Sequence, residues 1–382
     1  MPQPIDRLLL PDAVAAEGGD AIARADSVGA LRPAGREAAQ DWSRVAAFAA
    51  TQGLRLDLSV TPRQFAGGFG NLNYLLRLAE GWAVLRRPPG GPIPAGGNDM
   101  AREHKVLSRL WRAYPLAPRG LAYCADPAVI GAPFQINEHR AGIAVRDSVP
   151  DAIVAAAGSA AAAGARLGGV LVPLAAALHG VDPAQVGLAD LGRPTGFLRR
   201  TAEGWAKRCA AAWDGNPPPL LDEIIAWLLA RTPPDGAACL IHNDFKLDNL
   251  LIDPATLAPT AVLDWDMATL GDPLYDLAVT LSYWTEAGDP PVMHALRQMP
   301  TAGPGFPRRA DALQAYARAT GRDLAGFAFH RALALVRLAG VFKQLHRRWS
   351  SGGSDEARLA GFGAVAEGLL EMAHAVTMGR AD

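Results

Sequence analysis

Three polar side chains in the second half of the chain have the types and the spacing that phosphoryl transfer requires. Asp244 is followed five residues later by Asn249, and Asp264 comes fifteen residues after Asn249. Transfer of a terminal phosphoryl group needs little covalent help, because most of the barrier falls through positioning the reactants and neutralising charge on the phosphate oxygens. We therefore expect Asp244 to accept the proton of an attacking hydroxyl, and Asn249 and Asp264 to hold Mg²⁺ across nucleotide phosphates. Lys246 would steady the transferred phosphate as a point charge.

Short apolar runs around these residues predict the elements that position them. Residues 239–241 are apolar and lead into a loop that carries the proposed base. Residues 250–252 and 260–263 favour strands on either side of an Asp-Pro turn, and such a hairpin would bring the two proposed metal ligands close together. Asp and Asn near strand ends also commonly cap backbone amides, which is the alternative for any one of them. The combined spacing of all three favours the catalytic interpretation.

The chain resembles the aminoglycoside phosphotransferase superfamily of protein-kinase-like small-molecule kinases in three stretches. These are residues 242–249 (HNDFKLDN), 263–266 (LDWD) and 271–278 (GDPLYDLA). Within that superfamily the resemblance is to the branch that includes kinase domains fused to acyl-CoA dehydrogenases, and it runs over about residues 65–351. It implies an α+β, protein-kinase-like bilobal fold, with a small antiparallel-sheet N-lobe and a larger, mainly helical C-lobe.

Length and composition agree with two lobes. The chain has 382 residues, half of them apolar, which exceeds one ordinary hydrophobic core. We expect an N-terminal arm over residues 1–35 and a nucleotide-binding N-lobe over residues 36–138. The C-lobe, with the catalytic loop, the metal site and the acceptor site, is expected over residues 139–382.

Hydrophobic spacing predicts the elements of the N-lobe. Helices are expected at residues 42–49 and 100–111, a hairpin over residues 65–76, and strands at residues 82–86 and 133–138. The resemblance implies that the last strand enters a hinge that meets adenine. Gln135 and Asn137 are therefore candidate nucleotide contacts.

A glycine cluster between two predicted strands is a candidate phosphate loop. Gly67, Gly68 and Gly70 would let backbone amides close over phosphates, although a simple turn also accounts for such a cluster. A dinucleotide-binding fold is disfavoured, because Asn73 replaces the third glycine of that motif and no helix follows. The sequence contains no Gly-Lys pair, which excludes a Walker-type phosphate loop.

The resemblance also implies a basic residue on the third strand that contacts the phosphates. Arg86 stands at that place, with Glu103 on the next helix as its ion-pair partner. The adjacent Arg87 is an alternative, and a solvated arginine at a strand end is another.

Structural roles are predicted for the polar residues around the proposed base and metal ligands. His242 is expected to fix the catalytic loop by hydrogen bonding, and Asp276 to tether the backbone of that loop. Asp272 before a proline suits the start of a helix. Asp248 and Asp266 lie near the proposed metal ligands and either join them or cap backbone groups.

Charge and cysteine usage restrict the partners and the compartment. Lys plus Arg number 37 against 38 Asp plus Glu, so we expect no general attraction to nucleic acid or to an acidic membrane surface. Three scattered cysteines without Cys-x-x-Cys pairs are typical of reduced thiols. The N-terminus lacks the pattern of a secretory signal, and residues 152–165 are predicted to form a tightly packed helix that is too short to span a membrane. The predicted location is cytoplasmic.

The acceptor is predicted from charge and from the resemblance. Residues 284–382 contain twelve Arg plus Lys against nine Asp plus Glu. This balance disfavours polycationic aminoglycosides and fits a substrate that carries phosphate or carboxylate. The branch implies hydroxyacyl-CoA thioesters such as 4-hydroxyacyl-CoA, and an acyl-CoA dehydrogenase as a functional partner. Four of the cations are expected close together on one helix, where the alternative is a solvated helix face: Arg337, Lys343, Arg347 and Arg348.

These observations together predict a magnesium-dependent small-molecule kinase with ATP or GTP as the phosphoryl donor. The alternatives are an aminoglycoside or amino-alcohol phosphotransferase and a pseudokinase that binds nucleotide without turnover. The base and both metal ligands are retained in the sequence, which argues against the pseudokinase.

Overall fold

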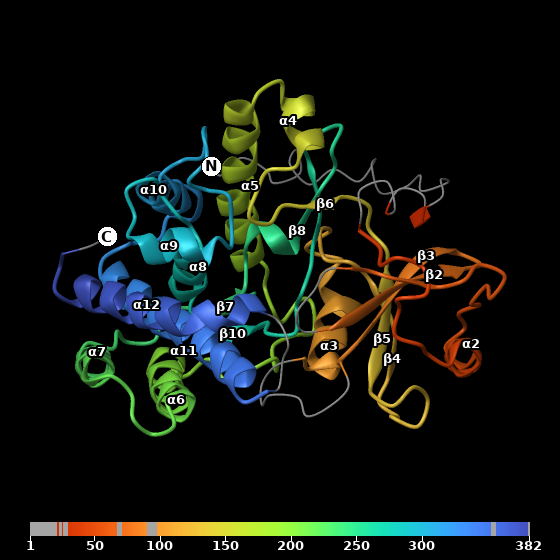
Figure 1. The fold of residues 1–382 in the computed structure, drawn as a ribbon, viewed down its shortest axis with the longest axis horizontal. Coiled ribbons are helices and arrows are strands. Elements are labelled where there is room, and N and C mark those ends of the chain that lie inside the picture. Colours follow the sequence, from red (N-terminus) through yellow and green to blue (C-terminus); the bar gives the residue numbers. More distant parts are fainter. Residues whose placement is uncertain are drawn as a thin grey trace. The chain divides into compact units, whose positions relative to one another are not determined.

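The computed structural model describes residues 21–22, 25, 30–66, 71–89, 98–352 and 357–380 (Figure 1). The chain divides into two compact units. Unit 1 comprises Met1–Ala144, Pro183–Leu191 and Asn249–Ala268, and unit 2 comprises Val145–Asp182, Gly192–Asp248 and Thr269–Asp382. Both units are discontinuous in the sequence, whereas the sequence predicts one boundary after residue 138. The predicted lobe limits stay a prediction.

Within the described residues, unit 1 contains a five-stranded antiparallel sheet in the order β1-β2-β3-β5-β4. Its strands are β1 (Arg63–Gln64), β2 (Leu72–Leu78), β3 (Gly81–Arg87), β4 (Gly120–Cys124) and β5 (Phe134–Glu138). The strands predicted at residues 82–86 and 133–138 correspond to β3 and β5. The short strand β4 was not predicted.

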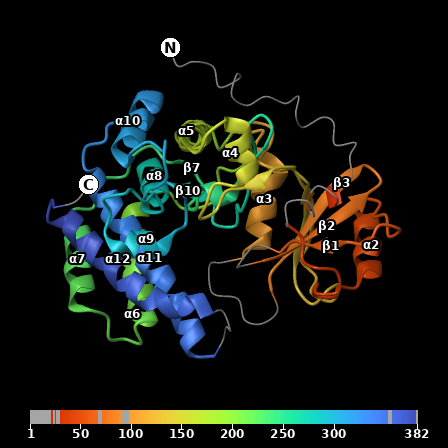
Figure 2. The same cartoon turned by 45° about the horizontal axis from the view of Figure 1, so that its top comes forward.

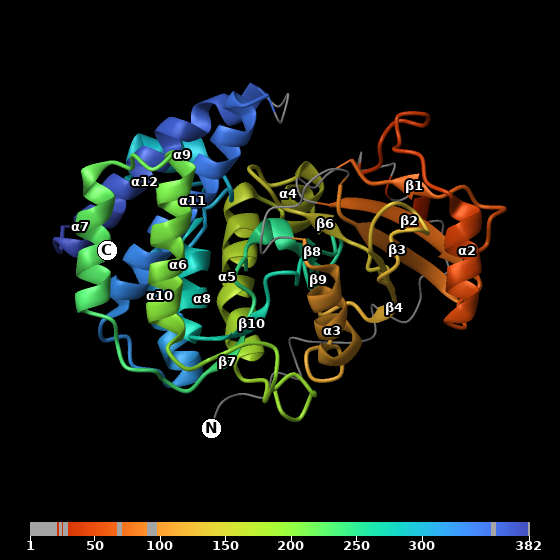
Figure 3. The same ribbon diagram turned by 90° about the horizontal axis from the view of Figure 1, so that it is seen from below.

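Two helices cover opposite faces of this sheet (Figures 1 and 3). They are α2 (Trp42–Thr51) and α3 (Met100–Leu110), which correspond to the two predicted helices of this region. Because successive strand side chains alternate between faces, Leu85 lies in the apolar core beneath α2 while Arg86 faces α3. The alternation therefore places the polar residues of β3 and β5 beside α3.

A second sheet of unit 1 carries the proposed metal ligands at its ends. It consists of β6 (Ile143–Ala144), β8 (Leu250–Ile252) and β9 (Pro259–Val262), in the order β6-β8-β9. The β8–β9 pair is antiparallel, which confirms the predicted hairpin, with the second strand starting one residue earlier than expected. Gly142 beside this sheet has a φ of +150°, and a Cβ there would lie 2.8 Å from Leu251 and from Thr260. A glycine is thus required where the chain enters β6.

Helices dominate unit 2. They are α4 (Asp151–Ala157), α5 (Ala160–His179), α6 (Phe197–Ala212), α7 (Pro219–Ala230), α8 (Pro273–Ser282), α9 (Pro291–Leu296), α10 (Arg309–Thr320), α11 (Phe327–Ser350) and α12 (Phe362–Thr377). The long helix α11 packs against α12, α8 and α6 (Figure 2). Strands β7 (Cys239–Ile241) and β10 (Thr269–Gly271) form an antiparallel pair, and the described residues also include 3-10 helices η3 (Leu247–Asn249) and η4 (Ala357–Gly361). The antiparallel sheet of unit 1 and the many helices of unit 2 confirm the predicted α+β class.

The single helix predicted over residues 152–165 is wrong. The structure has two helices there, α4 and α5, because Gly158 ends α4 with a φ of +81° and Ser159 caps α5 by accepting from the amide of Ala162. Close packing is nevertheless present, since a Cβ on Gly164 would lie 2.2 Å from the carbonyl oxygen of Pro304.

Among the described residues, two helical segments have the length and hydropathy of a membrane span. They are Ala160–His179, of whose most apolar window 56% is buried, and Leu359–Thr377, of whose window 44% is buried. Both are weak indications, because buried core helices have the same length and composition.

Candidate active site

The first group of predicted site residues centres on Arg86 in unit 1. Its Nε lies 2.8 Å from Oε2 of Glu103, and its Nη2 contacts Oδ1 of Asp264. Burial lowers the pKa of Arg86, but Asp264 and Glu103 outweigh this and hold the pKa above its usual range. Arg87 points elsewhere and donates to Oε1 of Gln40 at 2.7 Å, so Arg86 is the arginine that joins this group. Its contact with phosphate stays a prediction.

Glu103 connects three elements of unit 1. Besides Arg86, it accepts a hydrogen bond from Nε2 of Gln135 at 2.6 Å and from the backbone amide of Trp265 at 3.3 Å. Burial raises the pKa of Glu103, and Arg86 opposes that shift. Glu103 thereby ties β3, β5 and the segment after Asp264 to α3.

Gln135 and Asn137 lie on β5, an inner strand of the sheet. Their backbones pair with β3 and β4, and the side-chain amide of Gln135 donates a hydrogen bond to Glu103. Asn137 is 7% exposed, and its Oδ1 has no hydrogen-bond partner among the described residues. The predicted role of both residues in nucleotide binding stays a prediction.

Asp264 follows β9 and has a φ of +68°, a left-handed conformation that Asp tolerates better than most residues. The backbone amide of Leu263 donates to the carbonyl of Asn249 at 2.7 Å, which brings the two ends of the hairpin together. Asp266 accepts from the amide of Asn98 at 2.9 Å. Burial, with Asp264 and Glu103 nearby, raises the pKa of Asp266 to about 8.

The side-chain oxygens of this group are suitable ligands for a hard cation such as Mg²⁺. Asn249 and Asp264 offer amide and carboxylate oxygens, the ligands that Mg²⁺ prefers, and the side chain of Asp264 is 35% exposed. Glu103, Asp264 and Asp266 crowd around one arginine, and a divalent cation would offset their surplus negative charge. Within the described ranges, no three His, Cys, Asp or Glu side chains form a metal site. Mg²⁺ commonly needs only one or two protein ligands when phosphates and water supply the rest.

The predicted phosphate loop, Gly67, Gly68 and Gly70, lies outside the described residues. Its role stays a prediction.

The second group of predicted site residues lies in unit 2 around Asp244. Nζ of Lys246 is 3.2 Å from Oδ2 of Asp244, and the hydroxyl of Tyr283 donates to Oδ1 at 2.6 Å. Burial raises the pKa of Asp244, but Lys246 and Arg337 outweigh it and hold the pKa well below its usual range. Asp244 is therefore an anion at neutral pH, poised to accept a hydrogen bond from a hydroxyl.

Buried hydrogen bonds fix the backbone of the loop that carries Asp244. Asp276 accepts from the amides of His242 at 2.9 Å and Asn243 at 2.6 Å, which confirms the predicted tether. Nδ1 of His242 accepts from the amide of Asp244 at 3.3 Å, in line with the predicted loop-fixing role. Asp272 caps α8 as expected, accepting from the next helical amides.

Sequence reasoning missed two contacts of this group, Tyr283 and the buried Arg337. Arg337 is 3% exposed and donates from Nη2 to the carbonyl of Asn243 at 2.8 Å. The four expected cations do lie on one helix, α11, but Arg337 is buried, whereas Lys343 lies over the ring of Trp213 and Arg347 pairs with Asp214. The signal for Arg337 was a lone charge within an apolar helical run, which is typical of a buried, compensated residue.

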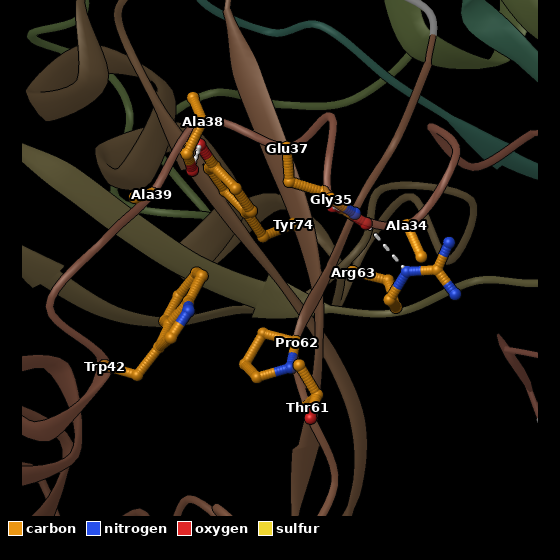
Figure 4. Close-up of a pocket in the computed structure, with 10 residues that line it drawn as sticks. All are labelled: Ala34, Gly35, Glu37, Ala38, Ala39, Trp42, Thr61, Pro62, Arg63 and Tyr74. Atoms are coloured by element: carbon orange, nitrogen blue, oxygen red, sulfur yellow. Dashed lines mark hydrogen bonds and ion pairs between the residues drawn. The ribbon is translucent and has the colours of Figure 1, made fainter.

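A separate cavity of about 220 Å³ lies in unit 1 beside β1 (Figure 4). Trp42, Pro62 and Tyr74 line it, and the ion pair between Glu37 and Arg63, 2.9 Å apart, borders it. None of the predicted site residues lines this cavity.

Fold and site together define a kinase-like phosphotransferase. The structure is similar to that of a putative aminoglycoside phosphotransferase from Ralstonia eutropha JMP134, with a TM-score of 0.71 and 25% identity over 89% of this chain and 99% of that chain. It also resembles macrolide 2'-phosphotransferase type I in fold, with a TM-score of 0.54 and 19% identity over 87% of this chain and 97% of that chain. These similarities confirm the protein-kinase-like fold.

Residues 61–330 match the model of the APH phosphotransferase enzyme family, so the chain belongs to this family and is a phosphotransferase. Acyl-CoA dehydrogenase family member 11 of Rattus norvegicus is 31% identical over 298 residues, which are 77% of this chain and 37% of that protein. Acyl-CoA dehydrogenase family member 10 of Mus musculus is 28% identical over 313 residues, which are 81% of this chain and 28% of that protein. The predicted branch is confirmed, and the chain spans between 28% and 37% of the length of these relatives.

Proposed function

We propose that the chain transfers the terminal phosphoryl group of ATP, with Mg²⁺, to the hydroxyl group of a small molecule. The observation that carries this proposal is the anionic carboxylate of Asp244, held between Lys246 and Tyr283. Membership of a phosphotransferase family supports the same reaction.

In this reaction the acceptor oxygen forms a bond to the terminal phosphorus while the bond from that phosphorus to ADP breaks. ADP leaves with the bonding electrons, and the hydroxyl proton passes to Asp244. Lys246 and Arg86 would neutralise phosphate charge, and Glu103 would hold Arg86 in place. Bound Mg²⁺, held by Asn249 and Asp264, would supply further charge neutralisation on the phosphate oxygens. These roles make residues 36–138 the proposed nucleotide-binding lobe and residues 139–382 the proposed catalytic and acceptor lobe.

The donor is proposed from structures of similar fold. Structures of a thermostable mutant of aminoglycoside phosphotransferase APH(4)-Ia are ternary complexes with hygromycin B and either AMP-PNP or ADP, with TM-scores of 0.53 and 0.52. An adenine nucleotide in those complexes supports ATP as the donor here, and GTP is the alternative to be compared directly.

We further propose a hydroxyacyl-CoA thioester as the acceptor. The matched relatives are named as acyl-CoA dehydrogenase family members, and the matched region covers less than half of each. A phosphotransferase joined to a dehydrogenase in one protein suits consecutive steps on one acyl-CoA substrate, which makes an acyl-CoA dehydrogenase the proposed functional partner. The surplus of cations in residues 284–382 fits the phosphates of CoA. Three free, buried cysteines fit the proposed cytoplasmic location.

A panel of acceptors tests this proposal. The protein is incubated with Mg²⁺ and either ATP or GTP, and with hydroxyacyl-CoAs, hydroxy acids, aminoglycosides or amino alcohols, and phosphorylated products are detected by mass spectrometry. We expect a phosphorylated hydroxyacyl-CoA that forms with the wild-type protein and is lost in Asp244→Asn. A product only from an aminoglycoside or amino alcohol would replace the proposed acceptor. Nucleotide binding without any product would favour a pseudokinase.

A further inference from the structure

Tyr283 and Arg337 form a hydrogen-bonded pair next to Asp244 in unit 2. The hydroxyl of Tyr283 donates to Oδ1 of Asp244 at 2.6 Å, and Nη1 of Arg337 donates to the hydroxyl oxygen of Tyr283 at 3.2 Å. Nη2 of Arg337 donates to the carbonyl of Asn243 at 2.8 Å. Arg337 is therefore linked to Asp244 in two ways. One link is the hydroxyl of Tyr283, and the other is the backbone of Asn243, which precedes Asp244.

The buried charge of Arg337 is compensated by the polar groups around it. A buried guanidinium destabilises a protein unless negative charge and hydrogen bonds compensate for its lost hydration. Burial lowers the pKa of Arg337, but Tyr283, Tyr275 and Asp244 outweigh burial and raise it above the usual range. Arg331 on the same helix is buried to the same degree, and burial lowers its pKa to about 9. These two buried arginines of α11 thus differ in their electrostatic surroundings, and Arg337 is the one compensated by the Asp244 group.

We propose that Tyr283 and Arg337 are positioning residues that act as one unit to orient the carboxylate of Asp244 toward the acceptor hydroxyl. This inference rests on the proposed function, because it assigns how the base of that reaction is held. Tyr283 would fix the rotation of the carboxylate, and Arg337 would fix both the hydroxyl of Tyr283 and the loop backbone.

The two carboxylate oxygens of Asp244 have different contacts, which suggest different roles. Oδ1 has a short hydrogen bond to Tyr283, whereas the contact of Oδ2 with Lys246 is longer, at 3.2 Å. Lys246 is drawn to the transferring phosphate by its charge, which leaves Oδ2 to accept the proton as the acceptor oxygen attacks phosphorus and ADP departs. A misplacement of about 1 Å at such a base costs roughly 100-fold in rate, so a residue that only orients it has a large kinetic effect.

Single-group substitutions test this inference. Tyr283→Phe removes one hydroxyl group, and Arg337→Lys keeps the charge but cannot reach both partners with a planar fork. The matched controls are Tyr74→Phe, a buried tyrosine of β2 whose hydroxyl donates to the carbonyl of Ala38, and Arg331→Lys, a buried arginine of α11 that donates to Ser282. All four variants and the double variant Tyr283→Phe with Arg337→Lys are compared with the wild type.

We expect Tyr283→Phe and Arg337→Lys each to lower kcat by about 10- to 100-fold, with the KM for ATP and the thermal midpoint unchanged. The double variant should lose little more than either single variant, because the two residues act as one unit. The two controls should keep kcat within roughly twofold of the wild type.

Three outcomes would overturn the inference. If Tyr283→Phe keeps kcat at the level of Tyr74→Phe while the wild-type protein transfers phosphate, the positioning role is wrong and the proposed function stands. If the two single effects multiply in the double variant, the residues do not act as a unit. If the wild-type protein transfers phosphate to no acceptor, the proposed function fails and this role falls with it. Tyr283→Phe alone decides the matter if Arg337→Lys does not fold.

Discussion

At the residue scale, opposite electrostatic surroundings separate the roles of similar carboxylates. Lys246 and Arg337 hold the pKa of Asp244 well below its usual range against the effect of burial. Burial and the neighbouring Asp264 raise the pKa of Asp266 to about 8. A single carboxylate that cations keep ionised is suited to accept a proton from a substrate hydroxyl. Several carboxylates close together are suited instead to bind a metal cation. Each unit therefore carries one half of the chemistry that the proposed reaction needs.

Asp244→Asn should slow transfer severely while leaving nucleotide binding intact. An amide cannot take up the hydroxyl proton, and a general base contributes about 10²- to 10⁴-fold in rate, so kcat should fall within that range. Rates are measured as phosphorylated product per time, and binding by calorimetry with Mg²⁺ and a non-hydrolysable ATP analogue. Lys246→Met serves as a comparison, because it removes the charge beside the same carboxylate. Undiminished transfer by Asp244→Asn would assign the base to another residue.

The difference between predicted and missed residues has a physical cause. Asp244, Asn249 and Asp264 could be proposed from the sequence because their predicted roles depend on local spacing within one loop and one hairpin. Tyr283 and Arg337 contact that loop across 39 and 94 residues of sequence, to Asp244 and Asn243 respectively. Spacing carries no signal over such separations, and the charge of Arg337 suggested contact with an anionic acceptor or an exposed helix face instead.

At the element scale, α8 holds the backbone of the loop that carries Asp244. Its N-terminal Asp272 caps the helix, and Asp276 one turn later holds two amides of the loop and Nε2 of His179, 3.0 Å away. His179 comes from the end of α5, and its Nδ1 lies 2.6 Å from the hydroxyl of Tyr316 on α10. Three helices of unit 2 therefore meet at one buried carboxylate.

Asp276 should make the protein sensitive to acid. The hydrogen bond with His179 helps to hold the pKa of Asp276 below its ordinary value of 3.8, against the opposing effect of burial. A carboxylate with a lowered folded pKa stabilises the fold above its ordinary pKa, and this stabilisation is lost as the pH falls through the folded value. The free energy of unfolding of the wild type should therefore fall more steeply below pH 3.8 than that of Asp276→Asn.

Urea unfolding at a series of pH values measures this dependence. At neutral pH, Asp276→Asn should be less stable by roughly 1–3 kcal/mol, because one buried acceptor is weakened. Asp222→Asn, an exposed acidic residue in the first turn of α7, is the control and should unfold like the wild type. Parallel pH curves for the wild type and Asp276→Asn would contradict the prediction.

Adjacent glycines of α5 should respond in opposite directions to substitution by alanine. A Cβ on Gly168 would lie 2.4 Å from Cδ of Pro307, whereas a Cβ on Gly169 has nothing within 4 Å. Gly168→Ala should destabilise the protein by about 1–3 kcal/mol through overpacking. Gly169→Ala should stabilise it by roughly 0.5–1 kcal/mol, because alanine favours a helix interior. Thermal unfolding compares the two, and equal effects would show that α5 does not pack tightly against the loop at Pro307.

The elements differ in how far their sequences predict them. The β8–β9 hairpin was predicted because turn residues separate two short apolar runs. The break between α4 and α5 was missed because alanine continues on both sides of Gly158 and Ser159, and only the cap geometry ends the helix. Strand β4 was missed because it has five residues, of which two are buried, so its pattern is weak.

At the scale of the whole molecule, the family and the fold were predictable from the sequence, whereas the make-up of the compact units was not. Motifs within 37 residues pointed to the family, because residues 242–278 hold all three quoted stretches. The compact units instead exchange segments, since Asn249–Ala268 belongs to unit 1 although unit 2 surrounds it in sequence. A linear pattern gives no information on which unit a hairpin joins.

Binding of the nucleotide should stabilise the whole molecule only when the proposed metal ligands are intact. A ligand that binds the folded state stabilises it by about 2.7 kcal/mol at 100 times its Kd, so the thermal midpoint should rise with the concentration of ATP and Mg²⁺. Replacing Mg²⁺ by EDTA should remove most of this rise, because phosphate charges would then face Glu103, Asp264 and Asp266.

Asp264→Ala should lose the Mg²⁺-dependent part of the rise and remain folded, since its side chain is 35% exposed. Asp311→Ala, an exposed residue of α10 that pairs with Arg308, is the control and should keep the full rise. An equal rise in Asp264→Ala would remove Asp264 from the metal site, and no rise with ATP or GTP in the wild type would contradict nucleotide binding itself.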